Sequence, residues 1–167
     1  MAIFLKVLRF LRGRYHLDIP FWLIEYYPPF WFMGVRIESI TRDYRTLVAS
    51  LPLRWYSKNL HGTMFGGHLC AAADPFPALM CGRIIGDLDV WSKVCSVEFK
   101  KPARSRVFMK IEITDEDIKE IRKQIETYQK ATHTFRFDYR DRKGTLIAEV
   151  SNTVYLKKRA RELPQAF

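Results

Sequence analysis

The sequence lacks a long uninterrupted run of apolar residues. No stretch approaches the roughly 18 to 20 residues that a membrane-spanning helix needs, and the N-terminus lacks the apolar core and small-residue cleavage site of an export signal. Internal repeats, low-complexity tracts and linkers are absent as well. We therefore expect a cytoplasmic protein that acts as this chain and folds as one domain over residues 1–167.

Cysteine is scarce, and its placement excludes two further classes of protein. Cys70, Cys81 and Cys95 are odd in number, lie in apolar contexts and show no metal-ligand spacing. Neither a disulfide scaffold nor a metal centre is expected, and free buried thiols fit a reducing compartment.

Acidic residues are few beside basic ones. The chain has 18 Asp and Glu against 28 Lys and Arg, for a formal net charge of +10. Such a charge attracts polyanions, which include nucleic acid, an anionic membrane surface and a multiply phosphorylated small molecule. The basic residues are dispersed without a recognised nucleic-acid-binding motif. No nucleic-acid partner is therefore expected, whereas a phosphorylated ligand and peripheral membrane contact stay open.

Residues 1–33 are expected to form an N-terminal helical extension. Residues 2–13 place apolar side chains on one helical face and basic ones on the other, which predicts a short basic amphipathic helix. Residues 20–32 then concentrate aromatic side chains around two prolines. We consider two roles for these aromatics, a lid or membrane-surface anchor and packing across a subunit interface, and the second is the commoner one for such stripes.

The remaining pattern, over 34–158, predicts the core of the domain. A β-hairpin is expected over 35–53, an apolar helix over about 66–86, and a surface helix over 115–129 that is capped by Thr114 or Asp115. Four more strands are predicted at 90–99, 106–114, 132–141 and 145–157. The order indicates an α+β fold in which an antiparallel sheet wraps around one long central helix.

A glycine pair at the start of the apolar helix is the first candidate for chemistry. Gly66 and Gly67 leave backbone N–H groups uncovered by any Cβ, at the positive end of a helix dipole. Such amides can stabilise an oxyanion. Close packing of the helix on the sheet, or a tight turn, would explain the same glycines without a function.

Asp74 is the candidate base or nucleophile. It follows three alanines, so apolar surroundings are expected, in which an ionised carboxylate is costly unless it is used. The alternative is that Asp74 caps a second helical segment that begins at Pro75. Pro75 and Pro77 each remove a backbone hydrogen bond and should break or kink the helix at this point.

These residues resemble those of the hotdog-fold acyl-CoA thioesterases. Asn59, Gly62, Gly66, Gly67 and Asp74 fall at the positions of the motif of the PaaI-like members, Ser92 stands where some members keep a serine or threonine, and Lys101-Pro102-Ala103 is similar to their strand end. The resemblance covers about 35–157. The N-terminal extension and the helix at 115–129 are more similar to a branch called tetrameric acyl-CoA thioesterases.

The resemblance implies hydrolysis of an acyl-CoA thioester, with coenzyme A as part of the substrate and no separate cofactor or metal. It also implies a homo-oligomer, dimer or tetramer, with active sites between protomers. Asn59 and the glycine turn, with Gly67, would come from one protomer and Asp74 from the other, and Ser92 would orient water. The residues expected to contact substrate are His61, Phe65, Gly66, Lys101, Arg104 and Arg106.

The chain departs from the family at Phe65, where the family has histidine. His61, four residues earlier in the same loop, is the residue that would compensate. An isolated loop asparagine such as Asn59 is commonly a turn residue, Ser92 is equally well a neutral filler, and the basic cluster between 100 and 110 is equally well a solvated edge. A non-catalytic acyl-binding or membrane-docking protein, and dehydration of a hydroxyacyl thioester, therefore remain alternatives.

Overall fold

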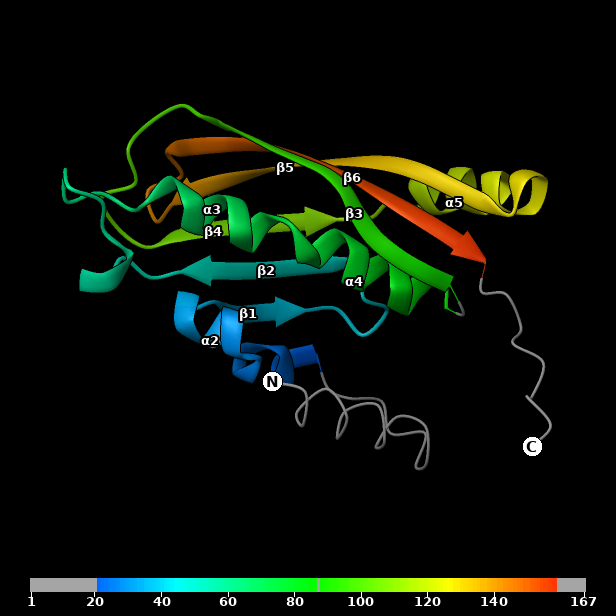
Figure 1. Cartoon of the computed structure of the whole chain (residues 1–167), viewed down its shortest axis with the longest axis horizontal. Helices are drawn as coiled ribbons and strands as arrows, with labels where there is room; N and C mark the ends of the chain where they lie inside the picture. The colour runs from blue at the N-terminus through cyan, green and yellow to red at the C-terminus, as the bar shows by residue number, and fades with distance from the viewer. Residues whose placement is uncertain (1–20, 87, 159–167) are drawn as a thin grey trace, which may run out of the picture.

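A computed structural model describes residues 21–86 and 88–158 (Figure 1). The predicted helix at 2–13 lies outside the described residues. The elements, in chain order, are η1 (Phe21–Tyr26), α2 (Pro28–Met33), β1 (Arg36–Ile40), β2 (Thr46–Leu51), η2 (Trp55–Ser57), α3 (Gly66–Ala73), α4 (Pro75–Ile84), β3 (Leu88–Phe99), β4 (Val107–Glu112), α5 (Asp115–Tyr128), β5 (Lys130–Asp141) and β6 (Leu146–Lys158).

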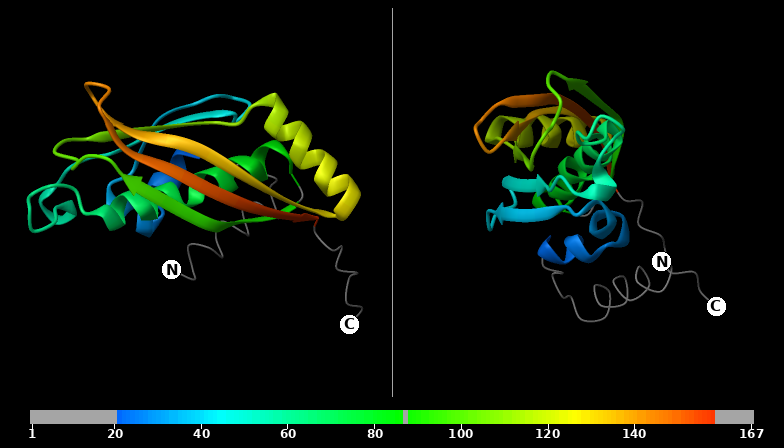
Figure 2. Two further views of the ribbon diagram at one scale, coloured as in Figure 1. Left: turned by 90° about the horizontal axis from the view of Figure 1, so that it is seen from above. Right: turned by 90° about the vertical axis from the view of Figure 1, so that its left-hand side faces the viewer.

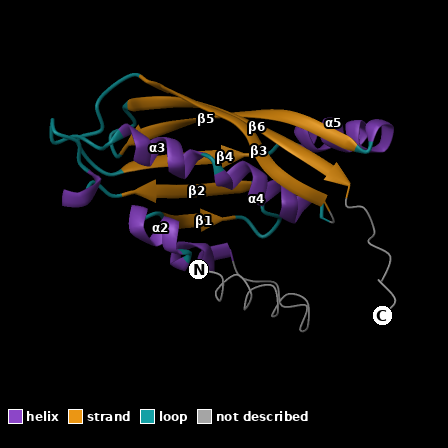
Figure 3. Cartoon of the chain, viewed as in Figure 1, coloured by secondary structure: helices purple, strands orange, loops and turns teal. Residues whose placement is uncertain are grey.

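The strands form one antiparallel sheet of six strands in the order β1-β2-β4-β5-β6-β3. The sheet curls around the helices α3 and α4, which run through its concave side (Figures 1 and 3). The end view in Figure 2 shows the same wrapping, with α5 beside the sheet. The predicted α+β arrangement is confirmed, and each predicted strand appears within a few residues of its expected bounds.

Alternation along the strands decides which face of the sheet is buried. On β5, Phe135, Phe137 and Tyr139 are buried beneath the central helices, and Arg136 and Arg140 between and beyond them are exposed. The hydroxyl of Tyr139 donates a hydrogen bond to the carbonyl oxygen of Leu69 on α3, at 2.9 Å. The sheet and the first central helix are thus joined by a polar contact as well as by apolar packing.

The expected long central helix is present and is divided into two segments. α3 ends at Ala73 and α4 begins at Pro75, and Asp74 lies between them. The prolines at 75 and 77 lack the N–H groups that an unbroken helix would use here, so the break falls where the sequence predicts it. The segment then ends at Gly86, which takes a left-handed φ of 72°.

Helix α5 has a complete N-terminal cap. Thr114 accepts a hydrogen bond from the amide of Asp117 at 3.1 Å, and the Asp117 carboxylate accepts one from the amide of Thr114 at 2.8 Å. His133 on β5 contacts the same carboxylate at 2.8 Å. Thr114 is therefore the cap, and one acid fastens the helix both to its own start and to the sheet.

The aromatic segment before β1 divides between the core and the surface. Phe30 is buried and stacks on Phe76 of α4 with ring centroids 5.5 Å apart, whereas Trp31 and Phe32 are exposed. Within the described part of the chain, no helix is both long enough and apolar enough to cross a membrane.

Candidate active site

A cavity of about 640 Å³ lies at the N-terminal end of α3, between the loop at 59–64 and the segment at 99–104. It brings together residues that are about 40 positions apart in the sequence. Five of the predicted site residues line it: Asn59, His61, Gly66, Lys101 and Arg104. This cavity is the candidate site.

The loop before α3 is organised by Asn59. Its side-chain oxygen accepts hydrogen bonds from the amides of His61 at 2.9 Å and Thr63 at 3.1 Å, and its side-chain nitrogen donates to the Thr63 hydroxyl at 2.9 Å. Gly62 completes the turn with a φ of 73°, in the left-handed region that favours glycine. The Asn59 amide is thus engaged in holding the loop, and its role in hydrolysis stays a prediction.

The glycine pair is shaped by two aromatic rings. A Cβ on Gly66 would lie 2.9 Å from the ring of Phe99, and a Cβ on Gly67 would lie 2.3 Å from the ring of Phe65. An alanine at either position would therefore require the ring of Phe99 or Phe65 to move. The amides of Gly66 and Gly67 make no hydrogen bond to another described residue. Only Gly66 lines the cavity, because the Phe65 ring lies against Gly67.

Asp74 is exposed in the single chain, which corrects the expectation of apolar surroundings. Leu69, Ala72 and Ala73 turn toward the sheet, and the opposite helical face carries Cys70 and Asp74 to the surface. Asp74 occupies the cap position of α4, but its side chain makes no cap hydrogen bond. The carboxylate of Asp74 therefore does not cap α4, and the alternative interpretation as a helix cap is wrong.

Asn152 is the residue that the sequence analysis missed. This side chain on β6 is fully buried, and its amide nitrogen donates to the carbonyl oxygens of Ala73 at 3.2 Å and Asp74 at 2.7 Å. Ser92 on β3 donates its hydroxyl to the same Asp74 oxygen at 2.6 Å. Two strands thus fix the helix break that presents Asp74, and Ser92 holds the backbone of the acid. Its predicted role with water stays a prediction.

The basic residues near the cavity fall into two groups. Lys101 and Arg104 line the cavity and form no ion pair with another described residue. Lys100 pairs with Glu98 at 2.6 Å and with Glu149 at 3.0 Å. Arg106 lies outside the cavity and pairs with Glu38 on β1 at 3.1 Å. Lys101 and Arg104 are therefore the cations whose charge is available to a ligand.

The nearby thiols are poorly suited to act as nucleophiles. Burial, with smaller contributions from Asp74 and Cys70, raises the pKa of Cys95 to about 11. Burial likewise raises the pKa of Cys81 to about 12, and it lowers the pKa of His68. Both cysteines are thus protonated thiols at neutral pH. In residues 21–86 and 88–158, no group of three or more His, Cys, Asp or Glu is placed to hold a metal ion.

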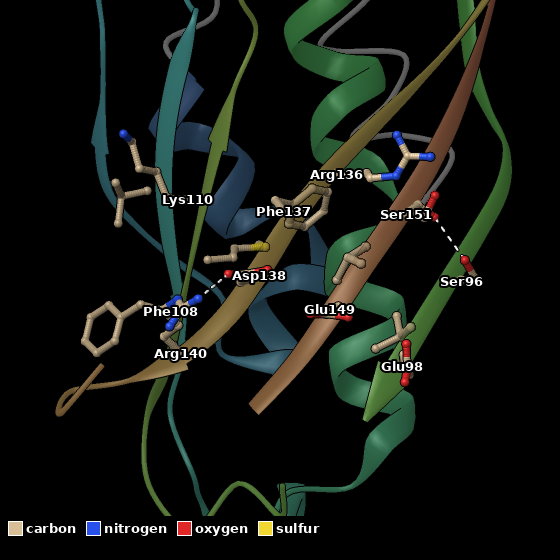
Figure 4. A pocket seen from close by; sticks show the side chains of 14 residues that line it. Ser96, Glu98, Phe108, Lys110, Arg136, Phe137, Asp138, Arg140, Glu149 and Ser151 are labelled. Atoms are coloured by element: carbon tan, nitrogen blue, oxygen red, sulfur yellow. Dashed lines mark hydrogen bonds and ion pairs between the residues drawn. The ribbon is translucent and has the colours of Figure 1, made fainter. Parts of the chain in front are cut away.

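A larger cavity of about 940 Å³ lies across β4, β5, β6 and β3 and contains none of the predicted site residues. Arg136 and Arg140 line this cavity and are exposed (Figure 4), whereas Tyr139, which alternates with them along β5, is buried on the other face. Most of its charges are already compensated, since Arg140 pairs with Asp138 at 2.6 Å and the two glutamates pair with Lys100. This surface therefore offers less unpaired charge than the cavity at α3.

Comparison with known proteins assigns the family. Residues 21–156 match the model of the family described as domain of unknown function DUF4442. The chain belongs to this family. No curated protein matches the sequence.

Solved structures share the fold of this DUF4442 chain. PA5026 of Pseudomonas aeruginosa, a probable thioesterase, has a TM-score of 0.72 at 18% identity over 82% of this chain and 92% of its own. Thioesterase HI1161 of Haemophilus influenzae has a TM-score of 0.65 at 13% identity, over 84% and 92% of the two chains. PaaI of the E. coli phenylacetic acid degradation operon has a TM-score of 0.60 at 14% identity, over 83% and 88%. The chain therefore has the hotdog fold, as the sequence resemblance implies.

Proposed function

We propose that this DUF4442 protein hydrolyses acyl-CoA thioesters at a site shared between two copies of the chain, without a metal. The observation that carries the proposal is the cavity at α3. Among the described residues, the amide of Gly66 there has no hydrogen-bond partner and the cations Lys101 and Arg104 have no ion-pair partner. The amide suits a developing oxyanion and the cations suit phosphate groups.

The glycine turn supplies the electrophilic half of the reaction. The Gly66 amide is at the N-terminal end of α3, where the helix dipole favours negative charge. A thioester carbonyl placed against it would become more electrophilic, because the amide bonds the oxygen more strongly as negative charge develops there. One such donor contributes on the order of 3 kcal/mol in well-studied enzymes.

The carboxylate of Asp74 supplies the basic half, and it comes from a second copy. Asp74 lies eight residues beyond Gly66, which is about 12 Å along a helix at 1.5 Å per residue. That separation is too large for both groups of one chain to act on one carbonyl. A twofold arrangement brings Asp74 of one copy toward Gly66 of the other and creates two equal sites.

The edge of the sheet provides a means of bringing two copies together. β3 is an edge strand of 12 residues, and it exposes Trp91, Val94 and Phe99. A long edge strand with exposed apolar side chains is a ready template for pairing with another strand. Phe99 packs over Gly66, so a partner at this edge would also approach the candidate site.

The carboxylate of Asp74 could act by either of two reaction mechanisms. As a general base, Asp74 accepts a proton from water while the water oxygen bonds the thioester carbon. The C–S bond then breaks, and Asp74 returns the proton to the leaving sulfur, which departs as the thiol. As a nucleophile, its oxygen bonds the carbon, expels the thiolate and leaves an anhydride that water then hydrolyses. Oxygen from labelled water appears in the carboxylate of Asp74 after single turnovers only by the second route.

Hydrolysis assays with acyl-CoA esters of several chain lengths test the proposal. Asp74→Asn should lower kcat by a hundredfold or more, in the usual range for loss of a general base, while Asp138→Asn, on the opposite face of the sheet, should not. Lys101→Ala with Arg104→Ala should raise KM for acyl-CoA but not for the same acyl group on N-acetylcysteamine, which lacks phosphates. Negligible rates for both wild type and Asp74→Asn would contradict hydrolysis and favour a non-catalytic acyl-binding protein, whereas equal and measurable rates would contradict the role of Asp74.

A further inference from the structure

Four exposed aromatic side chains gather at one end of the molecule, at α2 and η2. We call them the aromatic patch: Trp31, Phe32, Trp55 and Tyr56, with exposed fractions of 55%, 68%, 85% and 38%. Three of these side chains are more than half exposed, although burial of an aromatic side chain is strongly favourable. Together with Arg36 and Arg54 they line a cavity of about 600 Å³.

The aromatic patch is fixed in place from beneath. Gly34, with a φ of 72°, allows the end of α2 to pack closely against the segment at 52–56. A Cβ on Gly34 would lie 3.2 Å from Pro52 and 3.3 Å from the Tyr56 hydroxyl. Phe30, beside Trp31, is anchored by its stack on Phe76. The buried hydroxyl of Ser57 accepts a hydrogen bond from the Arg54 amide at 2.8 Å. The exposed rings are thus presented by two anchored segments.

The charge around the aromatic patch is positive. No Asp or Glu lines this cavity. Arg36 is compensated by Glu25 at 3.2 Å, whereas Arg54 forms no ion pair with another residue of the described ranges. The aromatic rings therefore stand beside a cation whose counter-charge is not supplied by the described part of the chain.

This chemistry fits a lipid surface better than a second copy. A twofold contact through the aromatic patch would bury both Arg54 side chains in the interface, with no carboxylate in either cavity to receive them. Anionic headgroups would supply the missing counter-charge. Trp and Tyr rings are favoured at the boundary between headgroups and acyl chains, because each combines an apolar ring with a polar N–H or O–H.

We infer that the aromatic patch docks the protein onto an anionic lipid surface, with the rings in the interfacial layer and Arg54 at the headgroups. The loop of the candidate site, 59–64, follows η2 directly in the sequence. A docked molecule would therefore hold that loop next to the membrane. The inference does not depend on hydrolysis, since lipid binding is measured without any substrate.

Vesicle co-sedimentation of the full chain tests the inference. Wild type should sediment with vesicles of phosphatidylcholine and phosphatidylserine and much less with phosphatidylcholine alone. Phe32→Ala with Trp55→Ala should weaken partitioning at least about tenfold, because two interfacial aromatic side chains lose their apolar contact. Tyr128→Ala, an exposed aromatic on α5 at the far end of the molecule (Figure 1), should leave binding unchanged.

A charge reversal separates the part played by Arg54 from the effect of net charge. Arg54→Glu should weaken binding to the phosphatidylserine vesicles several-fold, and Arg122→Glu on the exposed surface of α5 should weaken it much less. All variants keep residues 1–20, so any contribution from that segment is the same in each.

Three results would overturn the inference. The first is a wild-type protein that does not bind vesicles, and the second is a Phe32→Ala, Trp55→Ala variant that binds them as well as wild type does. The third is a change in oligomeric state in that variant without vesicles, measured by analytical ultracentrifugation, which would assign the aromatic patch to a second copy. Circular dichroism of each variant shows whether a loss of binding reflects a loss of fold.

Discussion

At the scale of single residues, Asn152 controls the break between the two central helices. Its amide bonds two carbonyl oxygens that flank the break. We expect Asn152→Leu to lower the free energy of unfolding by about 1–3 kcal/mol, because buried carbonyls lose a donor. Urea unfolding measures the change. Ser151→Ala, next in the strand but half-buried, should stay within about 0.5 kcal/mol of wild type. Equal stability of Asn152→Leu would contradict a stabilising role for this amide.

Part of the candidate site is predictable at this scale and part is not. The family resemblance is enough to propose that Asn59, Gly66 and Lys101 act together, and the cavity does contain all three. The exposure of Asp74 is not predictable from three preceding alanines, since the helix turns its small residues both inward and outward. Asn152 is 78 residues from Asp74. No feature of the sequence around Asn152 indicates that this strand residue contacts the helix break.

At the scale of elements, the start of α5 links a helix to the sheet through one acid. Burial by itself raises the pKa of Asp117, but hydrogen bonds from the amide and hydroxyl of Thr114 and from His133 outweigh it and hold this pKa below the usual value. A lowered pKa in the folded state contributes stability above the unfolded-state pKa. That stability is lost as the pH falls through the lowered value.

Asp117→Asn should therefore cost stability that depends on pH. We expect the free energy of unfolding to fall by about 1 kcal/mol at neutral pH, the usual size for a capping interaction. The difference in this free energy between variant and wild type should shrink as the pH falls below the usual range of aspartate pKa values. Thermal unfolding across that range measures it. Glu116→Gln, in the same first turn, is the matched control because no hydrogen bond of its side chain to a described residue is observed. A difference that stays constant with pH would contradict the role of the charge.

The strands and helices themselves follow closely from local pattern. Period-two alternation places β4, β5 and β6 within a few residues, and Pro75 with Pro77 predicts the break between α3 and α4. The order of the strands in the sheet does not follow from local pattern, because β3 lies beside β6 through contacts between distant segments. The periodicity of the sequence does not predict that order.

At the scale of the whole molecule, the edge strand β3 is expected to join two copies. Val94 is 55% exposed on this strand. Val94→Lys would place a charge on the edge and bring like charges together across a twofold axis, so we expect it to shift the protein from dimer to monomer. Analytical ultracentrifugation measures the change. Tyr128→Lys adds the same charge on α5 and should leave the dimer intact. A wild-type protein that is already monomeric would contradict the pairing.

Mixing two inactive variants tests whether each site is shared between copies. We expect Gly66→Ala to damage the electrophilic half, because the added Cβ would crowd the ring of Phe99, which also lines the cavity. Asp74→Asn removes the basic half. In a hybrid dimer one site receives both defects and the other receives neither. Random exchange of equal amounts makes half of the dimers hybrids, so activity should recover to about a quarter of wild type. Each variant mixed with itself gives the baseline. Native mass spectrometry shows whether hybrid dimers form. If they form but the activity of the mixture equals only the sum of the two baseline activities, Gly66 and Asp74 of different chains do not act on one substrate.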